Sequence, residues 1–121
     1  MTTQTNGAVQ DLTPQEVQTR LDAGSILLID VREPSEYEAE RIQGALLFPL
    51  STFDASRLPP DAERCIVFQC GTGKRSAQAA LKRLAAGAPR AAHLAGGIGA
   101  WKSAGLRVIA RDPATGGPVL R

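Results

Sequence analysis

Histidine, cysteine and aromatic residues are all scarce in this sequence, and each shortage excludes a class of protein. The 121 residues include one histidine, two cysteines, one tryptophan, one tyrosine and three phenylalanines. Two cysteines are too few for a disulfide-based scaffold. With His93 as the single histidine, a zinc site is poorly supplied with ligands. We therefore expect no metal ion and no other cofactor.

The chain also lacks a strong excess of one charge and a long hydrophobic run. Its 14 Lys and Arg against 12 Asp and Glu give a net charge of +2, which argues against a dedicated nucleic-acid-binding protein. The longest aliphatic run, residues 26–29, is far shorter than the ~20 apolar residues of a membrane-spanning helix. The polar N-terminus has no signal-peptide pattern. We therefore expect a cytoplasmic domain with one core, and the sequence leaves open its oligomeric state and whether it belongs to a longer, membrane-anchored protein.

Apolar runs alternate with helical patterns along the chain, which is typical of an α/β protein. The runs are unbroken, as in strands that are buried on both faces of a parallel sheet. Strands that alternate with helices form right-handed βαβ units and a mainly parallel sheet. Strands are predicted over residues 25–30, 44–49, 65–69 and 91–94, and helices are predicted to begin after Thr13, at Pro34, near Ser76 and near Ile98.

Two of these helices have recognisable features. Thr13, Pro14 and Glu16 have the types and spacing of a capping box with proline at the first helical position. After Ser76, apolar residues recur at helical spacing, which predicts a buried face. That face consists of Ala77, Ala80, Leu81 and Leu84, and the solvent side consists of Gln78, Lys82 and Arg83.

The two ends of the chain are predicted to lie outside the domain, which covers residues 8–108. Residues 1–7 are predicted to be a flexible N-terminus. Residues 109–121 contain two prolines and two glycines and show no periodicity, so they are predicted to form an extended or disordered tail.

The two thiols lie in different settings. Cys65 and Cys70 stand at opposite ends of a predicted strand, roughly 16 Å apart at about 3.3 Å per residue, whereas a disulfide needs Cα atoms within about 7 Å. Cys65 lies in the strand without polar neighbours, which predicts a buried structural residue. Cys70 follows the strand's C-terminal end, where ligands bind in open α/β sheets.

Residues 70–76, CGTGKRS, predict an anion-binding loop with a reactive thiol. Gly71 and Gly73 permit backbone angles that turn successive N–H groups inward, and the following helix adds its positive end. Lys74 and Arg75 add full positive charge. A thiol in such a setting has its pKa lowered and forms a thiolate readily. A nucleotide phosphate loop does not fit, because a Walker motif has four residues between its first Gly and Gly-Lys-Ser/Thr.

Four segments of the chain match motifs of one family, in the family's order. Residues 70–76 match its active-site loop, residues 28–37 its Asp-Val-Arg segment, residues 41–45 its Gly-His-Ile-x-Gly-Ala segment, and residues 94–101 its Gly-Gly-x-x-x-Trp signature. The chain thus resembles the rhodanese-like domains of the thiosulfate sulfurtransferases. One departure is Arg41, which stands where the family usually has histidine. The resemblance implies a mainly parallel five-stranded sheet with helices on both faces.

The resemblance also implies a sulfurtransferase that works through a persulfide on Cys70. Thiosulfate or another small anionic sulfane donor supplies the sulfur, and cyanide or a thiol such as glutathione or thioredoxin removes it. An alternative is a persulfide carrier or regulatory sulfur-relay module with little turnover of thiosulfate. Phosphatase chemistry is disfavoured, because four residues separate Cys70 from Arg75 and related cell-division phosphatases have five. The residues expected to bind the donor are Gly71, Thr72, Gly73, Lys74, Arg75 and Ser76.

Other polar residues are predicted to have structural or surface roles. The resemblance implies that Asp30, Arg32 and Glu36 brace the loops around the site, and Arg32 is within reach of Glu36 across one helical turn. His93 is predicted to be structural or solvated, and Trp101 to fill the core under the last helix. A solvated surface is predicted for Lys82, Arg83, Arg90 and Arg107.

Overall fold

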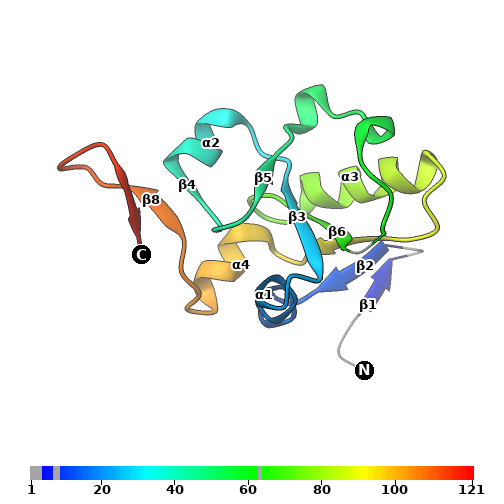
Figure 1. Ribbon diagram of the computed structural model, residues 1–121, viewed down its shortest axis with the longest axis horizontal. Helices are drawn as coiled ribbons and strands as arrows, with labels where there is room; N and C mark the ends of the chain where they lie inside the picture. The colour runs from blue at the N-terminus through cyan, green and yellow to red at the C-terminus, as the bar shows by residue number, and fades with distance from the viewer. Residues whose placement is uncertain (1–3, 7–8, 63) are drawn as a thin grey trace.

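A computed structural model describes residues 4–6, 9–62 and 64–121 and confirms the α/β class. Figure 1 shows helices packed around a twisted central sheet. The strands are β1 (Gln4–Asn6), β2 (Val9–Leu12), β3 (Ile26–Asp30), β4 (Glu40–Arg41), β5 (Leu46–Leu47), β6 (Cys65–Gln69), β7 (Ala91–Leu94), β8 (Ile109–Arg111) and β9 (Pro118–Leu120). The helices are α1 (Pro14–Asp22), α2 (Pro34–Ala39), α3 (Lys74–Ala85) and α4 (Gly97–Ser103), with short 3-10 turns η1 (Leu50–Thr52) and η2 (Ala55–Arg57).

The main sheet in the described part of the chain has six strands in the order β1-β2-β7-β6-β3-β5. The five strands from β2 to β5 in this order run parallel, which confirms the predicted five-stranded parallel sheet, and β1 adds an antiparallel edge. β3 and β6 pair over their full length, from Ile26 opposite Cys65 to Asp30 opposite Gln69. Because all these strands point the same way, the residues after β3 and β6 emerge at one edge of the sheet.

Helices cover both faces of the sheet, as expected, and each face has its own apolar cluster. One cluster packs Val17 of α1 and Trp101 of α4 against the sheet, and Trp101 is buried as predicted. The other cluster packs Ala79 and Ala80 of α3 against Phe68 of β6. Figure 1 shows α1 and α4 on one side and α3 on the other. The central strands are buried on both faces, which explains why β3 and β6 are unbroken apolar runs.

The start of α1 follows the sequence prediction. The Thr13 hydroxyl accepts from the backbone N–H of Glu16 at 3.1 Å, and the Glu16 carboxylate accepts from the backbone N–H of Thr13 at 2.9 Å. This capping box, with Pro14 as the first helical residue, satisfies two N–H groups that lack helical partners.

The predicted buried face of α3 is wrong by one position. The residues that the helix buries are Ser76, Ala79, Ala80 and Arg83, whereas Leu81 is 54% exposed. The helix begins at Lys74, and its first turn brings Ser76 under the preceding loop, which sets the rotation of the whole helix. Arg83 is buried instead of solvated, because its guanidinium donates to the carboxylate of Asp61 at 3.1 Å and to the Pro59 carbonyl at 3.2 Å.

The two ends of the chain are also partly built into strands. The C-terminal residues 109–121 form the hairpin β8–β9, and β8 pairs with β4 to complete a three-stranded sheet. This segment is therefore extended but paired, and the sequence analysis did not predict the pairing. Of the predicted flexible residues 1–7, Gln4–Asn6 form β1, and the others lie outside the described residues.

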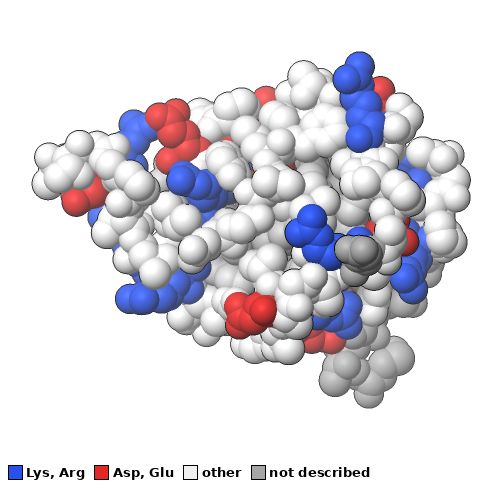
Figure 2. Space-filling model, viewed as in Figure 1, with Lys and Arg blue, Asp and Glu red and all other residues white. Residues whose placement is uncertain are grey.

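The described surface carries a mixture of charges, and none of the described helices has the length and hydrophobicity needed to cross a bilayer. Figure 2 shows basic and acidic side chains interspersed over the visible face, with no large area of one sign.

The burial of Arg83 generates a stability prediction. Arg83→Ala is expected to lower the free energy of unfolding by about 3 kcal/mol, because the largely buried Asp61 carboxylate would lose its nearest cation. Urea denaturation followed by Trp101 fluorescence measures this loss. The matched control is Arg57→Ala, whose side chain is 79% exposed in a 3.7 Å pair with Asp54. Its expected effect is within about 0.5 kcal/mol, and equal losses in the two variants would contradict the assigned role of Arg83.

Candidate active site

The candidate site lies in the loop between β6 and α3, at the C-terminal edge of the sheet. Cys70 follows the last residue of β6, and Gly73 precedes the first residue of α3. Gly73 has φ of +102°, a left-handed conformation that glycine adopts without a steric cost. The chain can therefore turn back at this point, and the first turn of α3 comes under the Cys70 side chain.

Hydrogen-bond donors surround the Cys70 sulfur. The backbone N–H of Gly73 donates to Sγ at 3.1 Å, and the hydroxyl of Ser76 lies 3.5 Å from Sγ. Burial raises the pKa of the thiol, but hydrogen bonds from the Ser76 side chain and from the backbone N–H groups of Ser76, Gly73 and Thr72 lower it. The balance leaves the pKa of Cys70 below its ordinary value. The setting thus favours a thiolate.

The sulfur is enclosed by its own loop. Cys70 and Ser76 are both 0% exposed, whereas Thr72 and Lys74 are on the surface. A reagent therefore reaches Sγ only when part of the loop moves away.

Helix α4 fixes the loop from the other side. The backbone N–H of Ile98 donates to the Cys70 carbonyl at 2.8 Å, and the N–H of Gly99 donates to the Gly71 carbonyl at 3.1 Å. At Gly97, where φ is +61°, a Cβ would lie 2.2 Å from the Cys70 carbonyl oxygen. The close approach of these two backbones explains Gly97 and Gly99 of the 94–101 motif, and it holds the Cys70 loop in place.

Arg75 is already paired within the protein. Its guanidinium donates to both carboxylate oxygens of Glu36 on α2, at 2.7 and 2.9 Å. The hydrogen bond from Arg75 is the largest of the effects that lower the pKa of Glu36 to about 2. The structure gives Lys74 no ion pair within the described residues, so no carboxylate there compensates its charge, whereas Glu36 compensates that of Arg75.

Asp30 and Arg32 form a second, fully buried pair beside the first. The Arg32 guanidinium donates to Asp30 Oδ2 at 2.8 Å and to the backbone carbonyl of Glu40 at 2.7 Å. Glu36 is within reach of Arg32 by helical spacing, but the guanidinium bonds instead to the Asp30 carboxylate, which is two residues earlier in the chain and buried with it. The Arg75–Glu36 pair connects α3 to α2, and the Asp30–Arg32 pair connects the end of β3 to Glu40 of β4.

Sequence analysis missed the setting of His93. This residue is buried on β7, with Nδ1 2.8 Å from Ser76 Oγ and Nε2 2.7 Å from Asp11 Oδ1. Asp11 lies opposite His93 in the parallel pairing of β2 with β7. Sequence patterns predict no strand at residues 9–12, so they do not place this carboxylate beside the only histidine of the sequence.

Cys65 is less isolated than expected. It is half-buried, and its Sγ lies 3.6 Å from the Arg90 guanidinium at the N-terminal end of β6. This end of the strand is opposite to the end that carries Cys70, and neither cysteine forms a disulfide.

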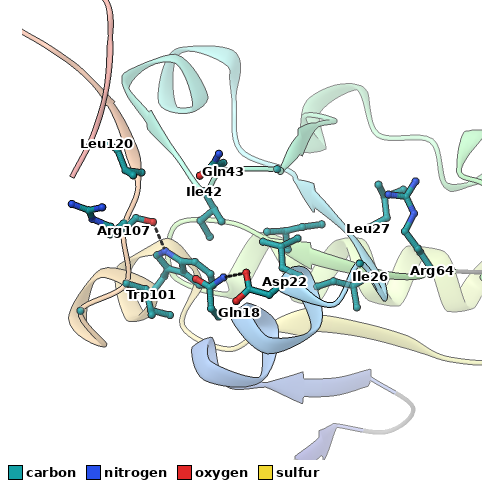
Figure 3. Close-up of a pocket in the computed structure, with 16 residues that line it drawn as sticks. Gln18, Asp22, Ile26, Leu27, Ile42, Gln43, Arg64, Trp101, Arg107 and Leu120 are labelled. Atoms are coloured by element: carbon teal, nitrogen blue, oxygen red, sulfur yellow. Dashed lines mark hydrogen bonds between the residues drawn. The ribbon is translucent and has the colours of Figure 1, made fainter.

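A separate hollow of about 710 Å³ lies away from Cys70, between α1, α4 and the N-terminal end of β3. Figure 3 shows its mixed lining, with Ile26 and Trp101 beside polar residues. Gln18 donates to Asp22 at 2.7 Å, and the Trp101 indole N–H donates to the Arg107 carbonyl at 2.9 Å. No residue of the 70–76 loop lines this hollow.

Metal chemistry has no evident ligand set, since the described residues contain no group of three or more His, Cys, Asp or Glu side chains that could hold a metal ion.

Comparison with known proteins points to the same family as the sequence motifs. The family model for the rhodanese-like domain matches residues 13–104. A protein named sulfurtransferase from Allochromatium vinosum is 34% identical over 107 residues, which cover 86% of this chain and 98% of that protein. A Synechocystis protein named slr1261 is 36% identical over 107 residues, 88% of this chain but 58% of that protein. The human single-domain sulfurtransferase TSTD1 superimposes with a TM-score of 0.67 at 28% identity, over 81% of this chain and 97% of that one.

The contact between α4 and the loop predicts a strong effect of one methyl group. Gly97→Ala is expected to lower the free energy of unfolding by at least about 3 kcal/mol, because the added Cβ overlaps the Cys70 carbonyl and φ is unfavourable. The control is Gly105→Ala, where φ is +81° but no atom lies within 4 Å of the added Cβ. Its expected loss is about 1 kcal/mol, from the backbone alone. Similar losses in chemical denaturation would contradict the close contact.

The Arg75–Glu36 pair predicts a pH dependence of stability. The pKa of Glu36 is lowered on folding, from 4.5 to about 2, so its contribution is complete above about pH 4.5 and decreases as the pH falls toward 2. Glu36→Gln removes this contribution. The difference in unfolding free energy between wild type and Glu36→Gln should therefore be constant from pH 7 to pH 5 and smaller at pH 3.5. A difference that grows as the pH falls would contradict the pairing.

Proposed function

The chain belongs to the rhodanese-like family, and from this premise we propose that it transfers a sulfane sulfur from thiosulfate, or a related anionic donor, to a thiophilic acceptor through a persulfide on Cys70. The observation that carries the proposal is the Cys70 sulfur at the end of β6, with the Gly73 N–H at 3.1 Å and the Ser76 hydroxyl at 3.5 Å. Sulfurtransfer is the activity associated with the family; the donor, the acceptor and the residue roles are our inference.

In the first half-reaction, the Cys70 thiolate attacks the outer sulfur of thiosulfate. A sulfur–sulfur bond forms to Sγ, and the bond between the outer sulfur and the sulfonate group breaks. The bonding electron pair leaves with sulfite, and the persulfide on Cys70 keeps one negative charge. No proton is consumed in this step, provided that the thiolate is present beforehand.

The loop supplies the positive potential for this step. The N–H groups that stabilise the thiolate, those of Thr72, Gly73 and Ser76, also face the negative charge of the persulfide, in the manner of an oxyanion hole. Lys74 attracts the dianionic donor at the surface. Arg75 acts mainly by connecting α3 to α2, because its Nη1 and Nη2 groups donate to the Glu36 carboxylate. This division of roles differs from the sequence expectation, in which both cations bind the donor.

In the second half-reaction, an acceptor nucleophile attacks the terminal sulfur of the persulfide. With cyanide the products are thiocyanate and the Cys70 thiolate, and with a thiolate they are a new persulfide and the Cys70 thiolate. The two half-reactions never need both substrates at once, so ping-pong kinetics are expected. Glutathione and thioredoxin are acceptors of the required chemistry.

The enclosure of Sγ affects how free and protein-bound donors reach it. Since Cys70 is 0% exposed, the loop must open before thiosulfate reacts. The same fact keeps the alternative of a persulfide carrier in contention, because a protein donor that binds the loop could open it.

The test compares the two cysteines as a matched pair. After incubation with thiosulfate, wild type and Cys65→Ala should both release sulfite and gain the mass of one sulfur atom, because Cys65 lies at the other end of β6. Cys70→Ala should do neither. Mass spectrometry of the intact protein and a sulfite assay measure both events.

Persistent labelling of Cys70→Ala, or its absence in wild type, would overturn the proposal. If thiosulfate released sulfite slowly while a protein persulfide loaded Cys70 rapidly, the result would favour a persulfide carrier over an enzyme that uses thiosulfate.

A further inference from the structure

A chain of hydrogen bonds leads from the Cys70 sulfur into the protein. Sγ lies 3.5 Å from Ser76 Oγ, which lies 2.8 Å from His93 Nδ1, and His93 Nε2 lies 2.7 Å from Asp11 Oδ1. Three different elements supply the links after the sulfur, namely α3, β7 and β2. Ser76 is 0% exposed and His93 is 7% exposed, so water has little access to the middle of this series of hydrogen bonds.

The Ser76 hydroxyl has one proton and several possible acceptors. It can donate to His93 Nδ1 at 2.8 Å, to the Gly73 carbonyl at 3.2 Å, or to the Cys70 sulfur at 3.5 Å. It stabilises a thiolate only when it donates to the sulfur. His93 Nδ1 must then carry a proton and donate to Ser76 Oγ, while Nε2–H donates to the Asp11 carboxylate.

We propose that Ser76, His93 and Asp11 form a proton path that accepts the thiol proton of Cys70 and holds the Ser76 hydroxyl as a donor to the sulfur. His93 and Asp11 are positioning residues here, because they act on the sulfur through Ser76. The proposal deepens the proposed function and rests on it for its role in sulfur transfer.

The proton transfer involves three atoms, Cys70 Sγ, Ser76 Oγ and His93 Nδ1, and no proton is gained or lost overall. When Cys70 ionises, the S–H bond breaks and its proton forms an O–H bond with Ser76 Oγ. The original hydroxyl proton moves to His93 Nδ1, which leaves a thiolate and an imidazolium. The summed charge of Cys70 and His93 is unchanged, and the Asp11 carboxylate on the far side of the ring stabilises the imidazolium. No outside base is needed.

The charges around the ring leave Asp11 as its nearest ionic partner. β7 packs against β2, β6 and α3. β2 carries Asp11, and the titratable groups at the two ends of β6 are Cys65 and Cys70. On α3, Arg75 is paired with Glu36 and Arg83 with Asp61, while Lys74 and Lys82 are on the surface.

The first experiment titrates the thiolate without any donor. In a Cys65→Ala background, Cys70 is the only thiol, and its thiolate is followed by ultraviolet absorbance from pH 5 to pH 10. The variants are His93→Gln and Asp11→Asn, and Asp22→Asn on the exposed end of α1 is the matched carboxylate control. Loss of the path should lower the thiolate fraction at pH 6.5 about threefold to tenfold in the first two variants and leave the control unchanged.

The second experiment uses the reciprocity of coupled titrations, which a purely structural histidine would not obey. Because the sequence has one histidine, its ring proton signals in NMR need no assignment. Cys70→Ala removes the thiolate that stabilises the imidazolium, so the ring of His93 should titrate at a lower pH than in wild type. Cys65→Ala should leave the His93 curve unchanged.

Superimposable thiolate curves in folded parent, His93→Gln and Asp11→Asn, or an unmoved His93 signal in Cys70→Ala, would overturn the proton path. If His93→Gln does not fold, the Asp11→Asn variant and the NMR experiment still decide. Failure of the proposed function is seen separately: the parent would then release no sulfite from thiosulfate, whatever the titrations show.

Discussion

The structure depends on one tight backbone contact, between the start of α4 and the loop that carries Cys70. The N–H groups of Ile98 and Gly99 donate to the carbonyls of Cys70 and Gly71. A Cβ at Gly97 would lie 2.2 Å from the Cys70 carbonyl oxygen, so no side chain fits there. With these carbonyls turned toward α4, the amide of Gly73 is free to point at the sulfur. The thiolate form of Cys70 is therefore stabilised by N–H and O–H dipoles that the fold fixes in advance, and the enclosure that fixes them also limits access to the sulfur.

Most of the charges near this edge of the sheet are matched within the protein. Glu36 pairs with Arg75 and so connects α2 to α3, and Asp30 at the end of β3 pairs with Arg32. Of the two cations that the sequence places in the loop, Arg75 is therefore compensated by Glu36, and Lys74 has no ion pair within the described residues. In the proposed sulfur transfer, a dianionic donor meets Lys74 at the surface, and the buried thiolate accepts hydrogen bonds from the loop. This arrangement suits a small anion that must enter, react and leave.

The parts of the fold that depend on local pattern were predictable. The unbroken apolar runs of β3 and β6, the capping box at Thr13 and the glycine loop after Cys70 are written in short segments of sequence. Contacts between distant segments were not. Asp11 and His93 are 82 positions apart and meet only through strand pairing, Arg83 is buried because Asp61 approaches from another loop, and residues 109–121 gain their partner in β4.

The central claim is that Cys70 carries the outer sulfur of the donor and nothing else from it. Thiosulfate labelled with radioactive sulfur at either position tests this directly, after removal of free reagent by gel filtration. Label in the outer sulfur should stay with the protein, one atom for each Cys70, and leave as thiocyanate on addition of cyanide. Label in the sulfonate sulfur should leave as sulfite. Sulfonate label retained on the protein, or outer label lost with the sulfite, would contradict the account.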